Sequence, residues 1–478
     1  MTSKPFGIQL VCAVALLGVM ASPSAAQSTQ PPGGGNPFSG LFKGSPKDQP
    51  HKLDLNGSTF VAWDDNVLAQ APNGNPIGIG FDPRGVRQGI ANGFQASVAY
   101  GFHTNGTRTQ FNADALGSVQ EFASSVGEDP LWFQSYNAGA GLRTGLTSKT
   151  FLSLGARSSY APYYQYAPFL RSTMNEESPV GTDYGYAVHS QWVRITSANA
   201  SLENRFSKRS SVSANIGWDQ QINPTNSDMD VDNLYAGARF NHNLTRKLAF
   251  HVGYIIQEST YKQRPNAEPF RTHNLDIGLG YGDGITIAFA RHYTLSLGFG
   301  VSVARNGDPI SVATTGKSTA FYANGSATLS RSIGRSWGAS LGYIRDTNYV
   351  LGFNEPILTD SANMGIGGPI FKRLHFSAGA GASRGQQVFS VTNESLISYS
   401  ASTRLTFGLL KNLGLYTQAS YYRYSIPDDF RTTFGFTPDL DRRSVSAGLT
   451  AWLPLIKPPR VRRTDDPTQQ QQSDRDTR

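Results

Sequence analysis

Apolar residues alternate with small or polar residues over most of the chain, from about position 53 to position 455. Within 94–102 the even positions hold Phe, Ala, Val, Tyr and Phe, and within 212–218 they hold Val, Ala, Ile and Trp. The residues between them are polar or small. A period of two indicates β-strands, whereas an amphipathic helix would repeat every 3.6 residues. We therefore expect an all-β chain in which each strand has one apolar face.

Short turns alternate with longer polar loops between these strands. The short turns are centred on 104–106, 147–149, 207–209, 245–247, 290–292, 332–335, 371–373 and 410–412. With both ends of the series on the same side, they predict about 18 antiparallel strands, or 16 if the weakest do not form. A single transmembrane β-barrel has this rhythm, with short periplasmic turns, longer extracellular loops, and strands that face lipid on one side and water on the other.

The two ends of the chain differ from this pattern. Residues 1–26 read as a signal peptide, with Lys4, an apolar stretch at 8–20 and a small-residue cleavage site at Ser24-Ala25-Ala26. Residues 27–50 are rich in Pro, Gly and Ser and are predicted to be a disordered periplasmic linker. The barrel is expected over 51–455, and residues 456–478 are expected to form a disordered polar tail. The prediction is an exported protein of the Gram-negative cell outer membrane.

Composition supports a barrel and excludes a helical membrane protein. After the signal peptide no run of about 18 apolar residues occurs. The length of 478 residues alone would suggest two or three soluble domains, but the hairpin rhythm is unbroken. The only cysteine, Cys12, lies in the signal peptide, so the mature chain is expected to have no disulfide and no thiolate metal site.

Basic residues gather at the short turns, and many carboxylates gather in the long loops. Contact with anionic phospholipid headgroups would explain a basic periplasmic ring. An electrostatic funnel that draws anionic solutes or polymers into the periplasmic mouth is the alternative explanation. The predicted ring consists of Lys149, Lys208, Arg209, Arg246, Lys247, Arg291, Lys372, Arg373 and Lys411.

The alternation also predicts which charged residues face the lumen. A barrel of 16 to 18 strands is too wide to be filled by its own side chains, so the lumen should be an aqueous channel unless a loop or plug enters it. The predicted lining charges can pair across the wall, or they can act as a selectivity filter. They are Arg108, Arg143, Arg157, Arg205, Arg239, Arg404, Asp114, Glu203 and Asp276.

Motifs for catalysis and metal binding fail on their spacing or on the structure expected around them. In the series Asp228, Asp230 and Asp232, Asn233 stands where a calcium loop needs glycine, and Arg239 stands where it needs a bidentate glutamate. The chain has no HExxH helix, and its two G-x-S-x-G sequences, at 338–342 and 381–385, lie in strand patterns without the strand-to-helix turn of a nucleophile elbow. The glycines at 278, 280, 282 and 284 have strand spacing and are expected to leave room in the lumen or at a turn. We predict no catalytic residues, no metal, no cofactor and no nucleic-acid partner.

Two short segments resemble those of outer-membrane proteins. Residues 446–453 resemble the last-strand signal that the barrel-assembly machinery recognises. Trp63-Asp64-Asp65-Asn66-Val67 resembles the opening of β-barrel porins of the kind found near exopolysaccharide secretion loci. The resemblance implies that the partners are the assembly machinery, outer-membrane lipid and lipopolysaccharide, an anionic polysaccharide, and periplasmic export components.

The expected function is a porin-like channel for hydrophilic solutes, and its sharper form is export of an acidic exopolysaccharide. One alternative is a surface structural or adhesin-type barrel that acts through its extracellular loops. Another is an outer-membrane lipid-modifying enzyme. An open lumen would favour a channel over an adhesin, and a Ser/His pair at the lipid-facing rim would favour the enzyme.

Overall fold

The computed structural model describes residues 51–66, 89–103, 108–123, 131–162, 192–222, 230–245, 249–262, 268–280, 293–306, 318–334, 336–348, 356–389, 394–427 and 439–456. These ranges contain 18 strands, which confirms the larger of the two predicted numbers. No helix in these ranges is long and apolar enough to cross a membrane. The strands are β1 (His51–Asp64), β2 (Gly89–His103), β3 (Thr109–Ala123), β4 (Leu131–Gly145), β5 (Thr150–Pro162), β6 (Trp192–Asn204), β7 (Ser210–Ile222), β8 (Val231–Asn243), β9 (Ala249–Tyr261), β10 (Phe270–Gly280), β11 (Tyr293–Arg305), β12 (Thr319–Ile333), β13 (Trp337–Asn348), β14 (Ile357–Phe371), β15 (Leu374–Gln387), β16 (Leu396–Leu410), β17 (Leu413–Ser425) and β18 (Asp439–Pro454).

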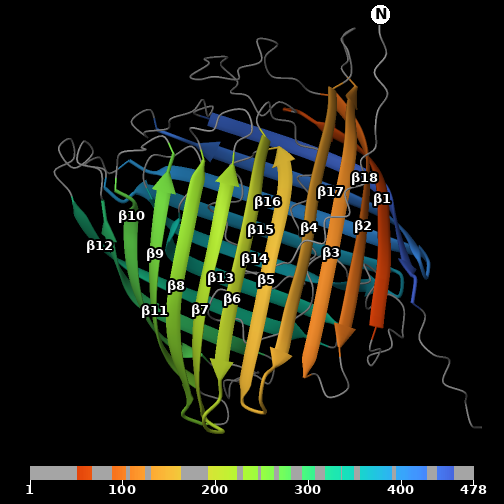
Figure 1. Ribbon diagram of the computed structural model, residues 1–478. Helices are drawn as coiled ribbons and strands as arrows, with labels where there is room; N and C mark the ends of the chain where they lie inside the picture. Colours follow the sequence, from red (N-terminus) through yellow and green to blue (C-terminus); the bar gives the residue numbers. More distant parts are fainter. Residues whose placement is uncertain are drawn as a thin grey trace, which may run out of the picture.

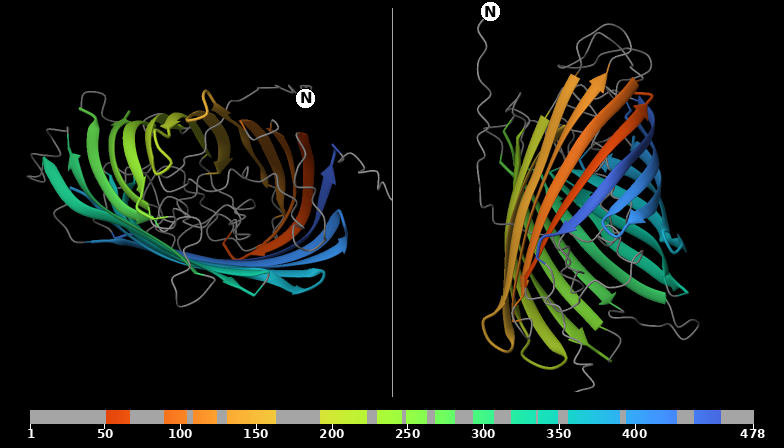
Figure 2. Two further views of the ribbon diagram at one scale, coloured as in Figure 1. Left: turned by 90° about the horizontal axis from the view of Figure 1, so that it is seen from below. Right: turned by 90° about the vertical axis from the view of Figure 1, so that its right-hand side faces the viewer.

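Every strand pairs with its neighbours in the sequence, and all pairings are antiparallel. β1 also pairs with β18, from Asp54 opposite Pro454 to Asp64 opposite Ser444, and this pairing closes the sheet into a barrel. Figure 1 shows the tilted strands from the side, and Figure 2 shows the closed ring from below. Closure leaves no sheet edge with unpaired backbone groups, as a membrane-spanning sheet requires.

The outer face of the barrel is apolar. Ile216 of β7 is 54% exposed, Phe299 of β11 is 65% exposed and Phe321 of β12 is 75% exposed, and each alternates with polar or small residues that face inward. A soluble protein rarely exposes so much apolar surface, but a transmembrane barrel needs it for contact with lipid. The chain is therefore an outer-membrane β-barrel.

Glycines on both faces of the sheet make room for large neighbours. A Cβ atom on Gly278 of β10 would overlap the ring of His251, which lies on the adjacent strand β9. On the outer face, a Cβ atom on Gly368 of β14 would overlap the indole of Trp337 of β13. Gly278 thus has the space-giving role expected from its strand spacing. Gly334 has a positive φ of 64° in the turn between β12 and β13, where glycine avoids backbone strain.

The seam between β1 and β18 carries a buried charge pair at the end of the barrel that bears the longer loops, here called the loop end. Nε of Arg442 donates to both carboxylate oxygens of Asp64, at 3.1 and 2.9 Å. Asp64 is 0% exposed and Arg442 is 5% exposed. Beside them, the backbone N–H of Arg443 donates to Oδ1 of Asp65 at 2.7 Å. The Asp64-Asp65-Asn66 segment of the porin-like motif therefore joins the first strand to the last.

The remaining domain predictions lie outside the described residues. These are the signal peptide at 1–26, the linker at 27–50 and, beyond Ile456, the polar tail.

Candidate functional site on the inner wall

Two ion pairs on the inner wall share one construction. Arg239 of β8 and Asp276 of β10 lie two strands apart, and the residue between them in register is Gly253 of β9. Because Gly253 has no side chain, the arginine can lie across β9, and its Nη2 reaches Oδ2 of Asp276 at 2.7 Å. Nε2 of His251 lies 3.1 Å from the same oxygen.

Arg157 of β5 and Asp114 of β3 repeat this construction across Gly139 of β4. Their charged atoms, Nη2 and Oδ2, are 3.8 Å apart. In both cases a cation and a carboxylate predicted to line the lumen are brought together over a glycine. The two pairs make the wall polar and add no net charge.

A third group lies near the end of the barrel that bears the short turns, here called the short-turn end. Glu203 accepts from Nε of Arg205 at 2.7 Å and lies 3.4 Å from Nη2 of Arg143. Both guanidinium carbons lie over the ring of Phe151, at 5.1 Å for Arg205 and 5.3 Å for Arg143. Two cations and one carboxylate leave a net positive charge here. Arg108 donates through Nε to the carbonyl of Gly145 at 3.0 Å and thus supports the adjoining turn.

Arg404 of β16 differs from the other lumenal arginines. Its guanidinium lies 4.1 Å from the ring centroid of Tyr416 on β17, and its register partner is Gln418. In the part of the chain that the structure describes, neither Arg404 nor Arg108 forms an ion pair, but the guanidinium of Arg108 donates to the backbone carbonyls of Gly145 and Leu146. Arg404 is therefore the predicted lining arginine best placed to contact a passing anion.

Six members of the predicted basic ring fall within the described ranges. All six side chains are exposed at the short-turn end: Lys149, Lys208, Arg209, Lys372, Arg373 and Lys411. Arg246, Lys247 and Arg291 lie outside those ranges. A role for the ring as a funnel or as a lipid contact remains a prediction.

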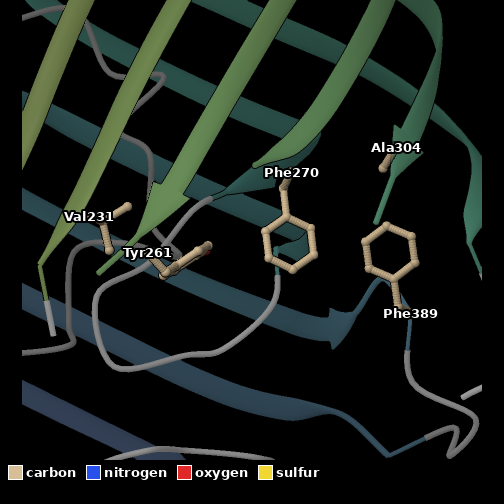
Figure 3. Packing of buried hydrophobic residues seen from close by; sticks show 5 residues of the cluster. All are labelled: Val231, Tyr261, Phe270, Ala304 and Phe389. Carbon is tan, nitrogen blue, oxygen red and sulfur yellow. The ribbon is translucent and has the colours of Figure 1, made fainter. Parts of the chain in front are cut away.

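An apolar cluster crosses the interior at the loop end. Phe389 follows β15 and is 0% exposed, and it packs on inward-facing residues of the wall formed by β8 to β11. Its ring centroid lies 5.9 Å from that of Phe270 on β10, five strands from β15 (Figure 3). The Phe389 cluster consists of Val231, Tyr261, Phe270, Ala304 and Phe389. Val388 and Phe389, the described residues after β15, thus pack inside the barrel against the wall formed by β8 to β11.

Replacing Phe389 with alanine should widen the loop end. Removing the buried ring forfeits about 2 kcal/mol of apolar burial, which would lower the ratio of docked to undocked segment about 30-fold. Single-channel recordings should then show a higher or more variable conductance. Phe389→Leu, which keeps most of the apolar contact, should behave like the unaltered protein. Equal conductance of the alanine variant and the unaltered protein would mean that the segment does not limit flow.

Asp230 and Asp232, from the series compared with a calcium loop, each have a side-chain partner. Asp230 lies 2.7 Å from Nζ of Lys262, and this hydrogen bond raises the pKa of that amine above its usual range. Asp232 accepts from Nε2 of Gln220, also at 2.7 Å. Asp228 lies outside the described residues. Within the described ranges, no three His, Cys, Asp or Glu side chains lie close enough together to hold a metal ion.

An outward-facing Ser/His pair does occur, at the short-turn end. Oγ of Ser210 lies 2.8 Å from Nδ1 of His242 on the neighbouring strand. In the described part of the chain His242 has no carboxylate partner to orient it. The N–H groups of Arg209 and Ser210 both donate to Oγ of Ser207, so neither is free to stabilise an oxyanion. The pair lacks the groups that a hydrolase needs and is best explained as a cross-strand contact.

Sequence patterns did not reveal several residues that shape this wall. Phe389 lies in a loop with no periodic signal, and the packing of Phe151 and Tyr416 against arginines depends on register between strands. The sequence shows Gly139 and Gly253, but it does not show which charged residues meet across them.

Comparisons with known proteins assign no family to the chain. No family model matches the chain, and neither does any curated protein. Among solved structures the chain is similar to OccK2 (OpdF) of Pseudomonas aeruginosa in complex with glucuronate, at 13% identity over 85% of this chain and 98% of that chain, with a TM-score of 0.41. It is also similar to the outer-membrane protein OpdK of P. aeruginosa, at 14% identity over 84% of this chain and 98% of that chain, with a TM-score of 0.39. Similarity at this level assigns no family, solute or partner.

Proposed function

We propose that this barrel is a passive, porin-like channel for small hydrophilic solutes. The observation that carries the proposal is the closed ring of 18 strands with a polar inner wall. A ring of this size leaves an aqueous interior, and the charged groups on its wall keep that wall hydrophilic. The Phe389 cluster restricts the width at the loop end and so favours small solutes.

The proposal does not include export of an acidic exopolysaccharide, which we expected from the resemblance to porins found near exopolysaccharide secretion loci. A polyanion sliding through the lumen would need a succession of unpaired cations along the wall. Arg143, Arg157 and Arg239 are instead engaged with carboxylates. No described residue favours the adhesin alternative, since most of the long loops lie outside the described ranges.

Planar-bilayer recording of the refolded mature protein tests the channel. Discrete conductance steps proportional to salt concentration are expected of a water-filled pore. If correctly folded protein inserted without producing such steps, the barrel would be closed and the proposal would be wrong.

Arg404 should contribute to selectivity. Arg404→Gln removes a lumenal positive charge, so the reversal potential in a salt gradient should shift toward cation preference. The shift should vanish near 1 M salt, where the Debye length is about 3 Å. Arg423→Gln on the outer face makes the same charge change and should leave selectivity unaltered. Equal behaviour of the two variants at low salt would remove Arg404 from the conduction path.

A further inference from the structure

A row of arginines lies on the outer face of the barrel at the loop end. By strand alternation each shares its face with the exposed apolar residues of its strand or of a neighbouring strand. Val301 is 51% exposed and is followed on the same face by Arg305, and Tyr343 is 41% exposed and is followed by Arg345. We call this set the outer arginine row: Arg271, Arg305, Arg345, Arg384, Arg423 and Arg443.

Carboxylates neutralise only half of the row within the described ranges. Arg271 pairs with Glu258 at 2.9 Å, Arg345 with Asp360 at 3.0 Å and Arg443 with Asp441 at 3.7 Å. In those same ranges, Arg305, Arg384 and Arg423 are exposed and form no ion pair. Asp360 and Asp441 lie opposite Arg384 and Arg423 in register, but each forms its ion pair with another arginine of the row. Within the described ranges the six arginines of the row therefore have only three carboxylate partners.

The register adds a second argument for an anion at the row. Arg271 and Arg305 are directly opposite each other on adjacent strands. Like charges in this position destabilise a sheet unless a counter-charge lies nearby. Glu258 supplies one negative charge to this pair of arginines, so one positive charge remains. An external anion at this height would neutralise it.

The surface next to the row indicates what carries that anion. Directly toward the middle of the barrel lie large exposed apolar side chains, among them Phe299 at 65%, Phe321 at 75% and Leu341 at 54%. A ligand that covers both surfaces must have acyl chains and an anionic headgroup. Arginine suits phosphate because its planar guanidinium can donate two parallel hydrogen bonds.

We propose that the outer arginine row binds the phosphate groups of the phosphorylated glycolipid of the outer leaflet, the lipid A part of lipopolysaccharide. Longer loops face the cell exterior in barrels of this kind, so the row lies at the level of outer-leaflet headgroups. The inference depends on this orientation and not on conduction. A barrel that proves closed in bilayer recordings could still bind the lipid.

Lipid binding to purified, refolded protein in detergent micelles tests the site. Bisphosphorylated lipid A should bind to the unaltered protein. Its affinity for the triple variant Arg305→Gln, Arg384→Gln, Arg423→Gln should be about 100-fold lower, because each lost arginine lowers the affinity about fivefold. The matched control Lys149→Gln, Lys208→Gln, Lys411→Gln changes charge equally at the short-turn end and should retain affinity. Native mass spectrometry gives the affinities, and the heat-dependent gel shift of folded barrels confirms that each variant is folded.

Three further ligands separate phosphate recognition from general adhesion. Dephosphorylated lipid A and phosphatidylglycerol should bind at least tenfold more weakly than bisphosphorylated lipid A, and inorganic phosphate alone should not compete. Equal binding of lipid A to the triple variant and the unaltered protein would overturn the site. Equal binding of phosphatidylglycerol, or displacement by inorganic phosphate, would overturn the assignment to the glycolipid.

Discussion

Arg442→Gln is expected to lower the free energy of unfolding by about 3 to 5 kcal/mol, because it leaves the carboxylate of Asp64 buried without its counter-charge. Asp64 is 0% exposed, and in the native protein its carboxylate accepts hydrogen bonds from Nε and Nη2 of Arg442 and from the backbone N–H of Asn66. The loss can be measured by urea unfolding in lipid vesicles. The effect should be large because the pair lies where the first and last strands meet.

Arg443→Gln is the matched control, one residue further along the same strand. Arg443 faces outward, its side chain is 67% exposed, and its ion pair with Asp441 spans 3.7 Å. An exposed pair of this kind contributes at most about 1 kcal/mol. A double variant, Asp64→Asn with Arg442→Gln, should recover part of the loss because no buried charge remains. Similar losses for Arg442→Gln and Arg443→Gln would show that the buried pair does not stabilise the seam.

Ile216→Arg is expected to cost about 2 to 4 kcal/mol if the residue lies near the middle of the bilayer. Ile216 is 54% exposed on the outer face at the centre of β7. Asn215, the preceding residue, faces the lumen, so Asn215→Arg places its charge in water and should be tolerated. Val98→Arg and Ser97→Arg form a second matched pair on β2.

Folded yield and unfolding free energy in vesicles distinguish the two faces. Losses confined to Ile216→Arg and Val98→Arg are expected, because hydrocarbon cannot solvate a guanidinium as water does. Comparable losses for the inward-facing variants would mean that the wall is tightly packed there, or that the assignment of faces is reversed.

The number of strands and their faces could be predicted from sequence because both depend on local patterns. Each strand must alternate to satisfy lipid and water, and each reversal needs polar turn residues, so β2, β7 and β10 can be recognised singly. The same alternation puts Arg239 and Asp276 on the lumenal face. It also puts Arg305, Arg384 and Arg423 on the outer face. Their position near the loop end can be seen only when the alternation is continued to the last residues of each strand.

The partners of these residues were decided by the tertiary structure. Arg239 meets Asp276 across Gly253 because three strands adopt one particular register, and register is a relation between strands that no single strand encodes. Phe389 packs on Phe270, on the far side of five strand pairings, because the barrel is curved and closed. Asp64 and Arg442 are 378 residues apart in sequence and meet only when the last strand pairs with the first. Local patterning determined which face each side chain takes, and closure of the ring determined which side chains meet.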